Sequence, residues 1–530
     1  MEILKERSRS LLKKCRDQDM NKNAFFKNTL GLVILTLLGR FIGFLREITL
    51  SYIYGSSEMS DAYVVANSIS TILFNGLFFG IMTAYIPLTY ECKTNEEVDK
   101  FTSNVINIVA TIVLIGIALL MIFLEPVISV FAIGFTEKAM RYTLEIARYA
   151  VLTIVFIMII NMTNGYLNTK SEFRFSGIYP IISNIIMCIV FVITKDSPSL
   201  LGIGYFFSIA LPAIWGIVLL KKKNYKYSFF IDLHDEKVRS LMKAAIPAFV
   251  GTSVIQLNVM IDRMFASTLS SGTVSALNYA DLLSSFAVQV FATSIATVTF
   301  PILSQMAAEK KYEAYKDLLE NRITIIVVIS VFLSGLIIPL SQNIVKLLFF
   351  RGAFDLQALI VTSDALMLYA PGIIGTSLNQ ILYKAFFAKR DTVTPFVCYG
   401  IGIVINIVLN FLFISKYQHK GLALATSISV LFIAILQLLA INHKLIKLGI
   451  QKIMIVCLKA GISGVAMIVC VHNMNIFLEK YLAQNSILMD ALKLVFLAVT
   501  SLLIYCSMCI LLKIEELKEI WYLINEKIRK

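Results

Sequence analysis

Apolar residues fill most of this chain in long runs, and short polar stretches separate the runs. A helix that crosses the roughly 30 Å hydrocarbon core of a bilayer needs about 20 residues. The predicted spans are Leu30–Tyr54, Asp61–Tyr90, Val105–Phe131, Thr143–Leu167, Gly177–Thr194, Leu200–Leu220, Leu241–Thr268, Ser275–Met306, Ile323–Phe350, Leu359–Phe387, Pro395–Ser415, Gly421–Ile446, Ile453–Met474 and Ile487–Leu512. The pattern predicts an all-α polytopic membrane protein with about 14 transmembrane helices and no soluble domain.

Composition supports this class. Of 530 residues, 58% are hydrophobic and only 15% are charged, and the mean hydropathy is +0.79. Soluble domains do not carry that much apolar surface. Cys506-x-x-Cys509 lies in the last predicted span with no histidine nearby, so we interpret it as packing and not as a redox or metal motif.

Basic residues gather on one side of the predicted spans. They crowd the arm of residues 1–27, the Lys221–Arg239 linker and the Lys310–Arg322 loop, whereas Gly55–Ser60 and Leu269–Gly272 have none. Cytoplasmic loops carry this excess, so both termini are predicted to be cytoplasmic. The arm has no continuous apolar core of a signal peptide. The net charge of +14 thus reflects topology and attraction to anionic lipid, and it does not indicate nucleic acid binding.

Catalytic motifs are missing from the sequence. The four histidines fall in loops or near helix ends, and there is no H-E-x-x-H, G-x-S-x-G or Walker A sequence. The outward loops are short, which argues against a glycan polymerase or ligase with a large extracellular catalytic loop. We therefore expect a secondary transporter and no enzyme.

Two arginines lie inside the first predicted span. Arg40 and Arg46 are six residues apart, so they are turned about 120° from each other on a helix and both can face one polar cavity. Charge at bilayer depth is costly, which makes a transport pathway the first hypothesis. The alternative is that one or both reach an interface, or that Arg46 neutralises Glu47.

The chain repeats a pattern in its two halves. Arg46, Gly55, Asp61 and Pro87 in the first half match Arg263, Gly272, Asn278 and Pro301 in the second, and Pro180 with Asn184 weakly matches Pro395 with Asn406. Transporters are commonly built from such repeats around a central site. The predicted parts are an arm at 1–27, a bundle at 28–221, a linker at 222–237, a second bundle at 238–446, two further helices at 447–513 and a tail at 514–530.

Several motifs in these halves resemble one family, the MurJ (MviN) lipid II flippases, in the MOP exporter superfamily with the MATE pumps. The resemblance implies an alternating-access carrier that turns undecaprenyl-pyrophosphate-linked peptidoglycan precursor to the outer leaflet of the bacterial cytoplasmic membrane. The motifs are Leu38–Glu47, Asp61–Tyr63, Leu277–Asp281, Phe350–Phe354, Phe386–Pro395 and Gly421–Ser427.

Residue roles follow from the same resemblance. Arg40 and Arg46 are expected in the cavity, because a guanidinium suits phosphate oxygens, with Asp61 as their acidic partner and Arg263 as a further basic residue. Residues 447–513 are expected to form a groove for the lipid tail. The resemblance also implies a monomer, with the cell-wall synthesis machinery as a candidate partner.

The chain departs from the family where basic residues are usual. It has Phe74 and Asn75 in the second span, and Leu282 directly after the Tyr-Ala-Asp motif. Either the headgroup is held by fewer contacts, or the cargo is another polyprenyl-linked glycan, such as a teichoic, capsular or exopolysaccharide precursor. A MATE-like drug exporter is a third reading, although its cavity would favour acidic or aromatic residues over Arg40 and Arg46.

A sodium site is also implied by the resemblance. The family's ligand positions correspond to Asp262, Asn406, Asn410 and Thr426, and their oxygens suit a hard cation. Asn410 stands where the family often has Asp, which removes one charge. The alternative is ordinary interhelical hydrogen bonding by Asn406 and Asn410, with Asp262 paired to Arg263. No other cofactor is expected.

Overall fold

The computed structural model describes residues 31, 34–195, 197–481 and 486–516. Within these ranges the secondary structure is helical and contains no strand, which confirms the all-α class. The predicted arm of residues 1–27 lies outside the described residues, and only residues 514–516 of the predicted tail lie inside them.

Polar residues at the ends of the apolar runs determine where several helices begin. The Thr94 hydroxyl accepts the Glu97 amide at the start of α3, and the Ser197 hydroxyl accepts the Leu200 amide at the start of α7. The first described helix covers residues 34–54. It is followed by α2 (Glu58–Thr89), α3 (Asn95–Ile122), α4 (Leu124–Phe131), α5 (Glu137–Thr169), α6 (Arg174–Ile193), α7 (Pro198–Lys222) and α8 (Glu236–Ser267).

Similar caps start helices in the second half. Asp355 accepts the Ala358 amide, and Ser486 accepts the Leu488 amide. The helices are α9 (Thr273–Val288), the π-helix η1 (Gln289–Thr293), α10 (Ser294–Ala308), α11 (Tyr312–Phe349), α12 (Leu356–Tyr369), α13 (Gly372–Ala388), α14 (Val393–Lys444), α15 (Ile450–Tyr481) and α16 (Ile487–Leu511).

Every predicted span is helical over most of its described residues, but Val105–Phe131, Ser275–Met306 and Leu359–Phe387 each run over more than one helix. Among the described residues, 11 helices are long and apolar enough to cross a membrane, or 12 if α12 and α13, which are bent by 49°, form one span. Two predicted spans, Pro395–Ser415 and Gly421–Ile446, share α14, whose backbone leaves helical geometry at Gln418 (φ 49°, ψ −129°). The count of fourteen spans stays a prediction.

The helices pack into two compact units. The first contains the described residues up to Leu50 together with 66–128 and 141–253, and the second contains 51–65, 129–140 and the described residues from 254 onward. The predicted bundles, 28–221 and 238–446, divide the chain elsewhere. Helices α2 and α8 each contribute to both units, so the start of α2 packs with the second half of the chain.

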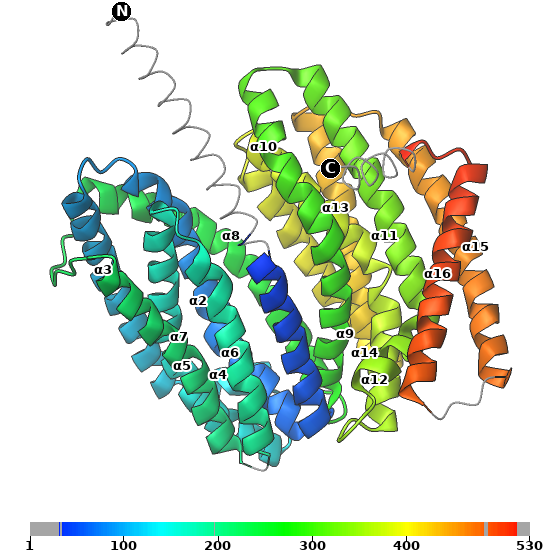
Figure 1. Ribbon diagram of the computed structural model, residues 1–530, viewed down its shortest axis with the longest axis horizontal. Coiled ribbons are helices and arrows are strands. Elements are labelled where there is room, and N and C mark those ends of the chain that lie inside the picture. The colour runs from blue at the N-terminus through cyan, green and yellow to red at the C-terminus, as the bar shows by residue number, and fades with distance from the viewer. Residues whose placement is uncertain (1–30, 32–33, 196, 482–485, 517–530) are drawn as a thin grey trace, which may run out of the picture. The chain divides into compact units, whose positions relative to one another are not determined.

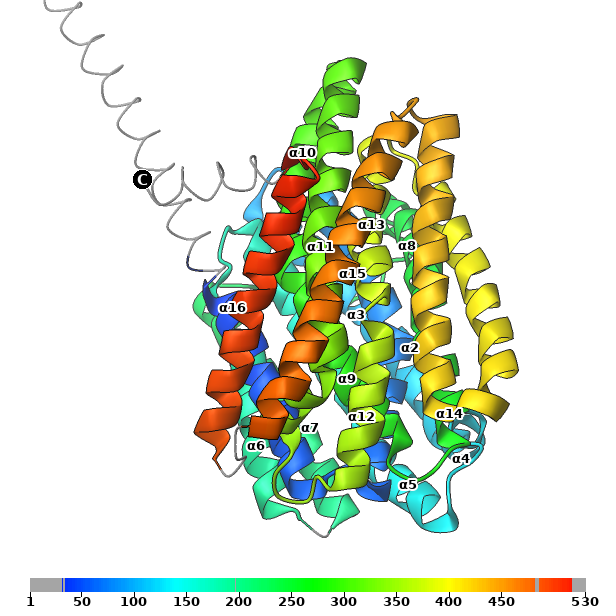
Figure 2. The same cartoon turned by 90° about the vertical axis from the view of Figure 1, so that its right-hand side faces the viewer.

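Each unit has its own apolar core. In the second unit, α15 and α16 lie side by side against α11 (Figure 1, Figure 2). The buried Tyr505 hydroxyl of α16 donates to the Val328 carbonyl of α11 at 2.9 Å, which ties this helix to the unit. A core of the first unit consists of Val98, Ile160, Tyr166, Leu167, Phe175, Ala213 and Leu220.

Candidate functional site

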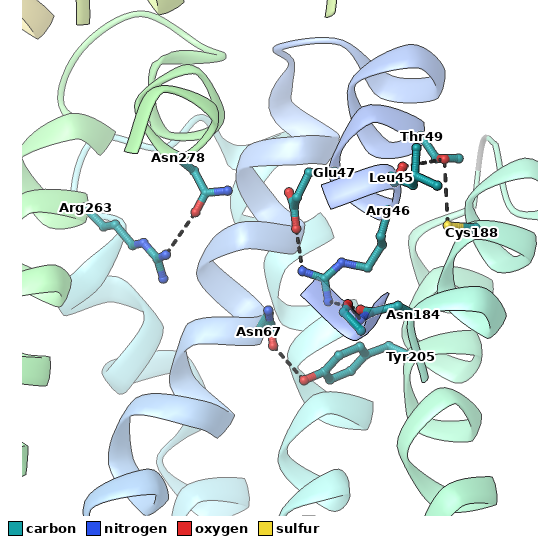
Figure 3. A network of polar contacts seen from close by, with 11 residues as sticks. Leu45, Arg46, Glu47, Thr49, Asn67, Asn184, Cys188, Tyr205, Arg263 and Asn278 are labelled. Atoms are coloured by element: carbon teal, nitrogen blue, oxygen red, sulfur yellow. Dashed lines mark hydrogen bonds and ion pairs between the residues drawn. The ribbon is translucent and has the colours of Figure 1, made fainter. Parts of the chain in front are cut away.

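Arg46 lies in a polar network of the first unit (Figure 3). Its guanidinium donates to the Asn184 side-chain oxygen on α6 at 3.1 Å and to a Glu47 carboxylate oxygen at 2.5 Å. The Arg46 side chain is 27% exposed and that of Glu47 is 7% exposed. The arginine is therefore half-buried. Glu47 balances its charge, which agrees with the alternative interpretation that Arg46 neutralises Glu47.

Small residues bring α6 close enough to reach this arginine. Asn184 approaches the backbone at Gly43, where an added Cβ would lie 3.2 Å from its Nδ2 atom. The same amide donates weakly to the Gly39 carbonyl at 3.5 Å. Small residues allow helices to approach closely in membranes, so the glycines on either side of Arg40 position the partner of Arg46.

Arg40 occupies a different environment. Its side chain is exposed on the first unit, and within the described residues it has neither a hydrogen bond nor an ion pair. Six residues of helix separate it from Arg46 by about 9 Å along the axis. The structure therefore does not join the two arginines in one network, and Arg40 keeps all its donors available.

A second contact of the first unit was not anticipated from the sequence. The Tyr205 hydroxyl of α7 donates to the Asn67 side-chain oxygen of α2 at 2.6 Å, and Figure 3 shows this pair near Arg46. Asn67 and Asn184 are both amides within apolar runs, which was the available signal. In the sequence, Asn184 stands out only as the repeat counterpart of Asn406.

Asp61 binds the backbone at the start of α9, a contact that the sequence did not predict. Its side chain is 3% exposed, and its two oxygens accept the backbone amides of Gly272 and Ser275, each at 2.7 Å. Both amides belong to the start of α9, where the helix dipole favours a negative charge. Asp61 thus caps α9 from a distant part of the chain, and this placement argues against its expected role as the acidic partner of the arginines.

The same region holds further contacts that fix the start of α2 in the second unit. The Ser60 hydroxyl donates to the Ser275 hydroxyl at 3.0 Å, and the Tyr279 hydroxyl donates to the Gly55 carbonyl at 3.0 Å. Gly55 has φ +63°, and an added Cβ there would collide with the Ala353 carbonyl. The segment 51–65 is therefore held by polar contacts together with buried apolar side chains such as Tyr63 and Val64.

In the second unit, the four residues expected to bind sodium come together. The Asn410 amide donates to Asp262 at 2.7 Å and to Asn406 at 3.0 Å. The Thr426 hydroxyl donates to Asp262 at 3.3 Å. Asn406 and Asn410 are fully buried, and they reach Asp262 of α8 from the first half of α14 while Thr426 reaches it from the second half.

This cluster borders a cavity of about 120 Å³. Asp262, Arg263, Asn278, Asp281, Tyr369 and Thr426 are among the residues that line it. Arg263 donates to the Asn278 side-chain oxygen at 3.2 Å. Asp262 accepts hydrogen bonds from Asn410 and Thr426, although it is adjacent to Arg263 in the sequence.

The cluster also passes a test of fit for a hard cation. The Oδ1 atoms of Asn410 and Asn258 are buried, and neither accepts a hydrogen bond from the described residues. Asn258 precedes Asp262 by one helical turn and donates to it at 3.5 Å. Free amide oxygens beside a half-buried carboxylate are the donors that sodium or another hard cation prefers. Asn258 was missed, although its four-residue spacing from Asp262 was visible.

Comparison with known proteins decides the family. The family model of lipid II flippase MurJ matches residues 50–513. The chain belongs to the MurJ family. A relative from Rickettsia prowazekii named probable lipid II flippase MurJ is 26% identical over 413 residues, which cover 76% of this chain and 81% of that protein. The predicted membership is confirmed.

Solved structures agree on the fold of this MurJ family chain. A lipid II flippase MurJ in an inward closed conformation has a TM-score of 0.77 at 24% identity and covers 90% of this chain and 98% of its own. An inward-facing MATE family multidrug resistance transporter of the MOP superfamily has a TM-score of 0.63 at 15% identity, with coverage of 79% and 95%. Both likenesses concern the fold alone.

One departure from the MurJ pattern has a packing explanation. Phe74, which stands where a basic residue is usual, is buried; its ring lies 6.3 Å from that of Phe78 and against Gly116 of α3. Its neighbour Asn75 is exposed. The first position is therefore part of the apolar core of this MurJ family chain, and only the second is open to a charged side chain.

Proposed function

We propose that this chain is a flippase that carries lipid II from the inner to the outer leaflet of the bacterial cytoplasmic membrane. The family match favours this cargo over another polyprenyl-linked glycan and over the substrates of a MATE-like exporter. The observation that carries the proposal within the molecule is Arg46, a charged side chain in an apolar helix that binds both Glu47 and Asn184.

Arg46 supplies the chemistry that a pyrophosphate needs. A guanidinium has five N–H donors in one plane and binds phosphate oxygens in a forked geometry. In the structure the Glu47 carboxylate accepts a hydrogen bond from one terminal nitrogen of the guanidinium, where a phosphate oxygen of the cargo would bind. Cargo phosphate displaces Glu47, and Asn184 keeps the guanidinium in place during the exchange. Arg40 adds an uncommitted positive charge for the same headgroup.

The cap on α9 supplies a reversible closure on the side that the Lys and Arg distribution makes outward. Asp61, Ser60 and Gly55 attach the start of α2 to α9 through hydrogen bonds. Opening the outward side exchanges these bonds for bonds to water, at a modest cost per bond because water satisfies the same groups. Such a closure suits a carrier that opens alternately to the two sides.

We propose that the half-buried Asp262 would hold a hard cation together with oxygens from both halves of α14. We assign its ligands to Asp262, Asn406, Asn410 and Thr426, and we add Asn258. In the structure the Asn410 amide donates to the carboxylate. Because these ligands lie on α8 and on both halves of α14, a cation held there would couple the two helices, which supports an ion gradient as the energy source.

We further propose that both termini face the cytoplasm, that the protein acts as a monomer, and that α15 and α16 guide the lipid tail. The described surface of α16 is rich in exposed apolar side chains, including Leu502, Leu503 and Ile510, which suits contact with lipid chains. These features concern the membrane arrangement and are independent of the cargo.

Complementation of a bacterial strain depleted of its own lipid II flippase tests the proposal. The full chain should restore growth and rod or coccal shape, and Arg46→Ala, produced at the same level, should not. If the full chain inserts correctly and yet fails to complement, while it supports export of another polyprenyl-linked glycan, the lipid II assignment is overturned.

A further inference from the structure

The linker between the two halves does not hang free in solution. Residues 225–233, which we name the strap, follow α7 and run in extended form along the first part of α3, and Figure 1 shows them as a loop at the edge of the first unit. The sequence analysis treated residues 222–237 only as a connection. The contacts of the strap with α3 give it a defined position.

Polar side chains of α3 bind the strap through its backbone. The Asn107 amide donates to the carbonyls of Ser228 and Phe230 at 3.1 and 2.8 Å. Asn104 pairs with the backbone of Asp232 in both directions, at 2.8 and 2.9 Å. These bonds explain why amides occur in an otherwise apolar helix.

The next polar residues toward the start of α3 continue the pattern. Asp99 accepts the Lys226 amide at 3.1 Å, and the Ser103 hydroxyl accepts the Ser228 amide at 3.2 Å. Asp99, Ser103 and Asn107 are spaced by four residues, so they form one stripe on the helix. All three are buried beneath the strap. The backbone of the strap is thus bonded to α3 at Lys226, Ser228, Phe230 and Asp232.

The strap turns apolar side chains away from α3. Tyr227 faces α3, where its hydroxyl donates to the Asn107 side-chain oxygen at 2.5 Å. The apolar side chains exposed on the strap are Phe229, Phe230, Ile231 and Leu233, with exposed fractions of 82%, 36%, 49% and 60%. A short segment with this much exposed apolar area is unfavourable in water and marks a contact surface.

The depth of the strap indicates what covers that surface. Asn107 lies about 18 Å along α3 from its start, by the rise of 1.5 Å per residue. The part of α3 after it, Ile108–Ile122, has no charged residue. The strap therefore lies at the interfacial level, next to the start of the hydrocarbon. Backbone groups of the strap that α3 does not bond can bind water and lipid headgroups at this level.

Positive charge flanks the apolar surface. Lys221, Lys222 and Lys226 are exposed beside the strap, while Lys223 pairs with Glu172. Basic residues next to inserted aromatic side chains are attracted to anionic lipid headgroups. We infer that the strap is an interfacial membrane anchor, with Phe229 and its outward neighbours inserted into an anionic leaflet and the lysines at its headgroups.

This anchor goes beyond the transport function and does not depend on the cargo. It fixes the linker to both α3 and the bilayer, so the first part of α8, which follows it, remains with the first unit. The two halves are then joined through a membrane-bound segment and not through a loose tether.

Fluorescence quenching in vesicles tests the inference on the purified full chain. The variant Phe229→Trp places a reporter at the outward tip, and His234→Trp places one at a side chain that is 91% exposed near the polar end of the same linker. Vesicles of phosphatidylethanolamine and phosphatidylglycerol carry bromine on the acyl chains near the headgroups. Emission of the wild-type chain, which contains Trp215 and Trp521, is subtracted.

Brominated lipid should quench the emission added by Phe229→Trp about twofold or more, and iodide should have little effect on it. The emission added by His234→Trp should respond in the opposite way. If iodide quenches both variants equally and brominated lipid quenches neither, the strap faces water and the inference is overturned, which would leave a protein partner as the occupant of the apolar surface. In phosphatidylcholine vesicles the lipid quenching should fall, and unchanged quenching there would overturn the role of the lysines.

Discussion

The Asp61 carboxylate accepts the Ser275 backbone amide at 2.7 Å, although 214 residues of sequence separate the two. Its other oxygen accepts the Gly272 amide, so one side chain of α2 satisfies two backbone donors at the start of α9. A helix usually takes its cap from the residue just before it. Here the cap comes from a distant segment, and α9 is fully capped only while that segment remains in place.

Replacing Asp61 by Ala should therefore affect both stability and transport. Two buried amides lose their acceptor, which should lower the free energy of unfolding by about 2 kcal/mol or more. Transport should fall because the outward closure is weakened. Thermal unfolding in detergent and a flipping assay in vesicles measure the two effects.

Asp355→Ala is the matched control for Asp61→Ala. Asp355 caps α12 from the adjacent position by accepting the Ala358 amide at 2.7 Å. Asp355→Ala should lower the free energy of unfolding by about 1 kcal/mol, because one exposed cap is lost, with little change in transport by the folded fraction. Equal transport defects in the two variants would contradict a special role for Asp61.

Substitutions of Arg46 should separate charge from geometry. Arg46→Ala should abolish flipping without loss of expression, because phosphate loses its counter-charge. Arg46→Lys should restore part of the activity, since the charge returns without the fork. Arg40→Ala is also expected to abolish transport. If both alanine variants flip cargo at the wild-type rate, neither arginine contributes to the transport pathway.

Glu47→Gln provides a further test of the proposed exchange. The substitution keeps a hydrogen-bond acceptor beside Arg46 and removes the competing negative charge. Cargo should bind more tightly, and its release should slow, so the half-saturating cargo concentration and the maximal rate should both fall. An unchanged half-saturating concentration would show that Glu47 and the cargo do not compete.

The cation cluster can be tested through the sodium dependence of transport. Asp262→Asn should reduce or remove any dependence, and Asn258→Ala should raise the sodium concentration that gives half of the maximal rate. Asn473→Ala is the control, because Asn473 lies exposed on α15 and donates only to the Val469 carbonyl. Transport that never responds to sodium, with or without Asp262, would favour plain interhelical hydrogen bonding.

The missing basic residues allow a test of the cargo. Phe74→Arg should destabilise the protein by several kcal/mol, because it buries a charge in the contact with Phe78 and Gly116. The Asn75 side chain is exposed, so Asn75→Arg should be tolerated. If the cargo is lipid II, Asn75→Arg with Leu282→Arg should keep or improve complementation of the depleted strain. Loss of complementation by this folded double variant would point to a changed headgroup.

Hydropathy predicted the helical spans well, because a bilayer imposes the same requirement on every crossing. It could not predict how the spans end or join. The break at Gln418 leaves two spans within one helical run, and α3 begins ten residues before the predicted start at Val105, so the polar stripe from Asp99 to Asn107 crosses that boundary. The four-residue spacing in that stripe was visible, but its partner, the strap backbone, carries no sequence signal of its own.

The candidate site was predictable to a different extent in each part. The positions of Asp262, Asn406, Asn410 and Thr426 came from the family resemblance, and the structure places all four in contact. The contacts of Asp61 could not be foreseen in this way. Its partners are backbone amides, which every residue has, so only the three-dimensional packing determines which of them it meets.

The close approach at Gly55 and Gly272 offers a way to trap the carrier. Both residues have positive φ, and an added Cβ would collide with the carbonyls of Ala353 and Ser56, respectively. Alanine at either position would wedge the start of α2 away from its neighbours in the second unit. Such variants would populate the outward-open state without a ligand, inhibitor or antibody, and they would give structural studies a ready source of that conformer.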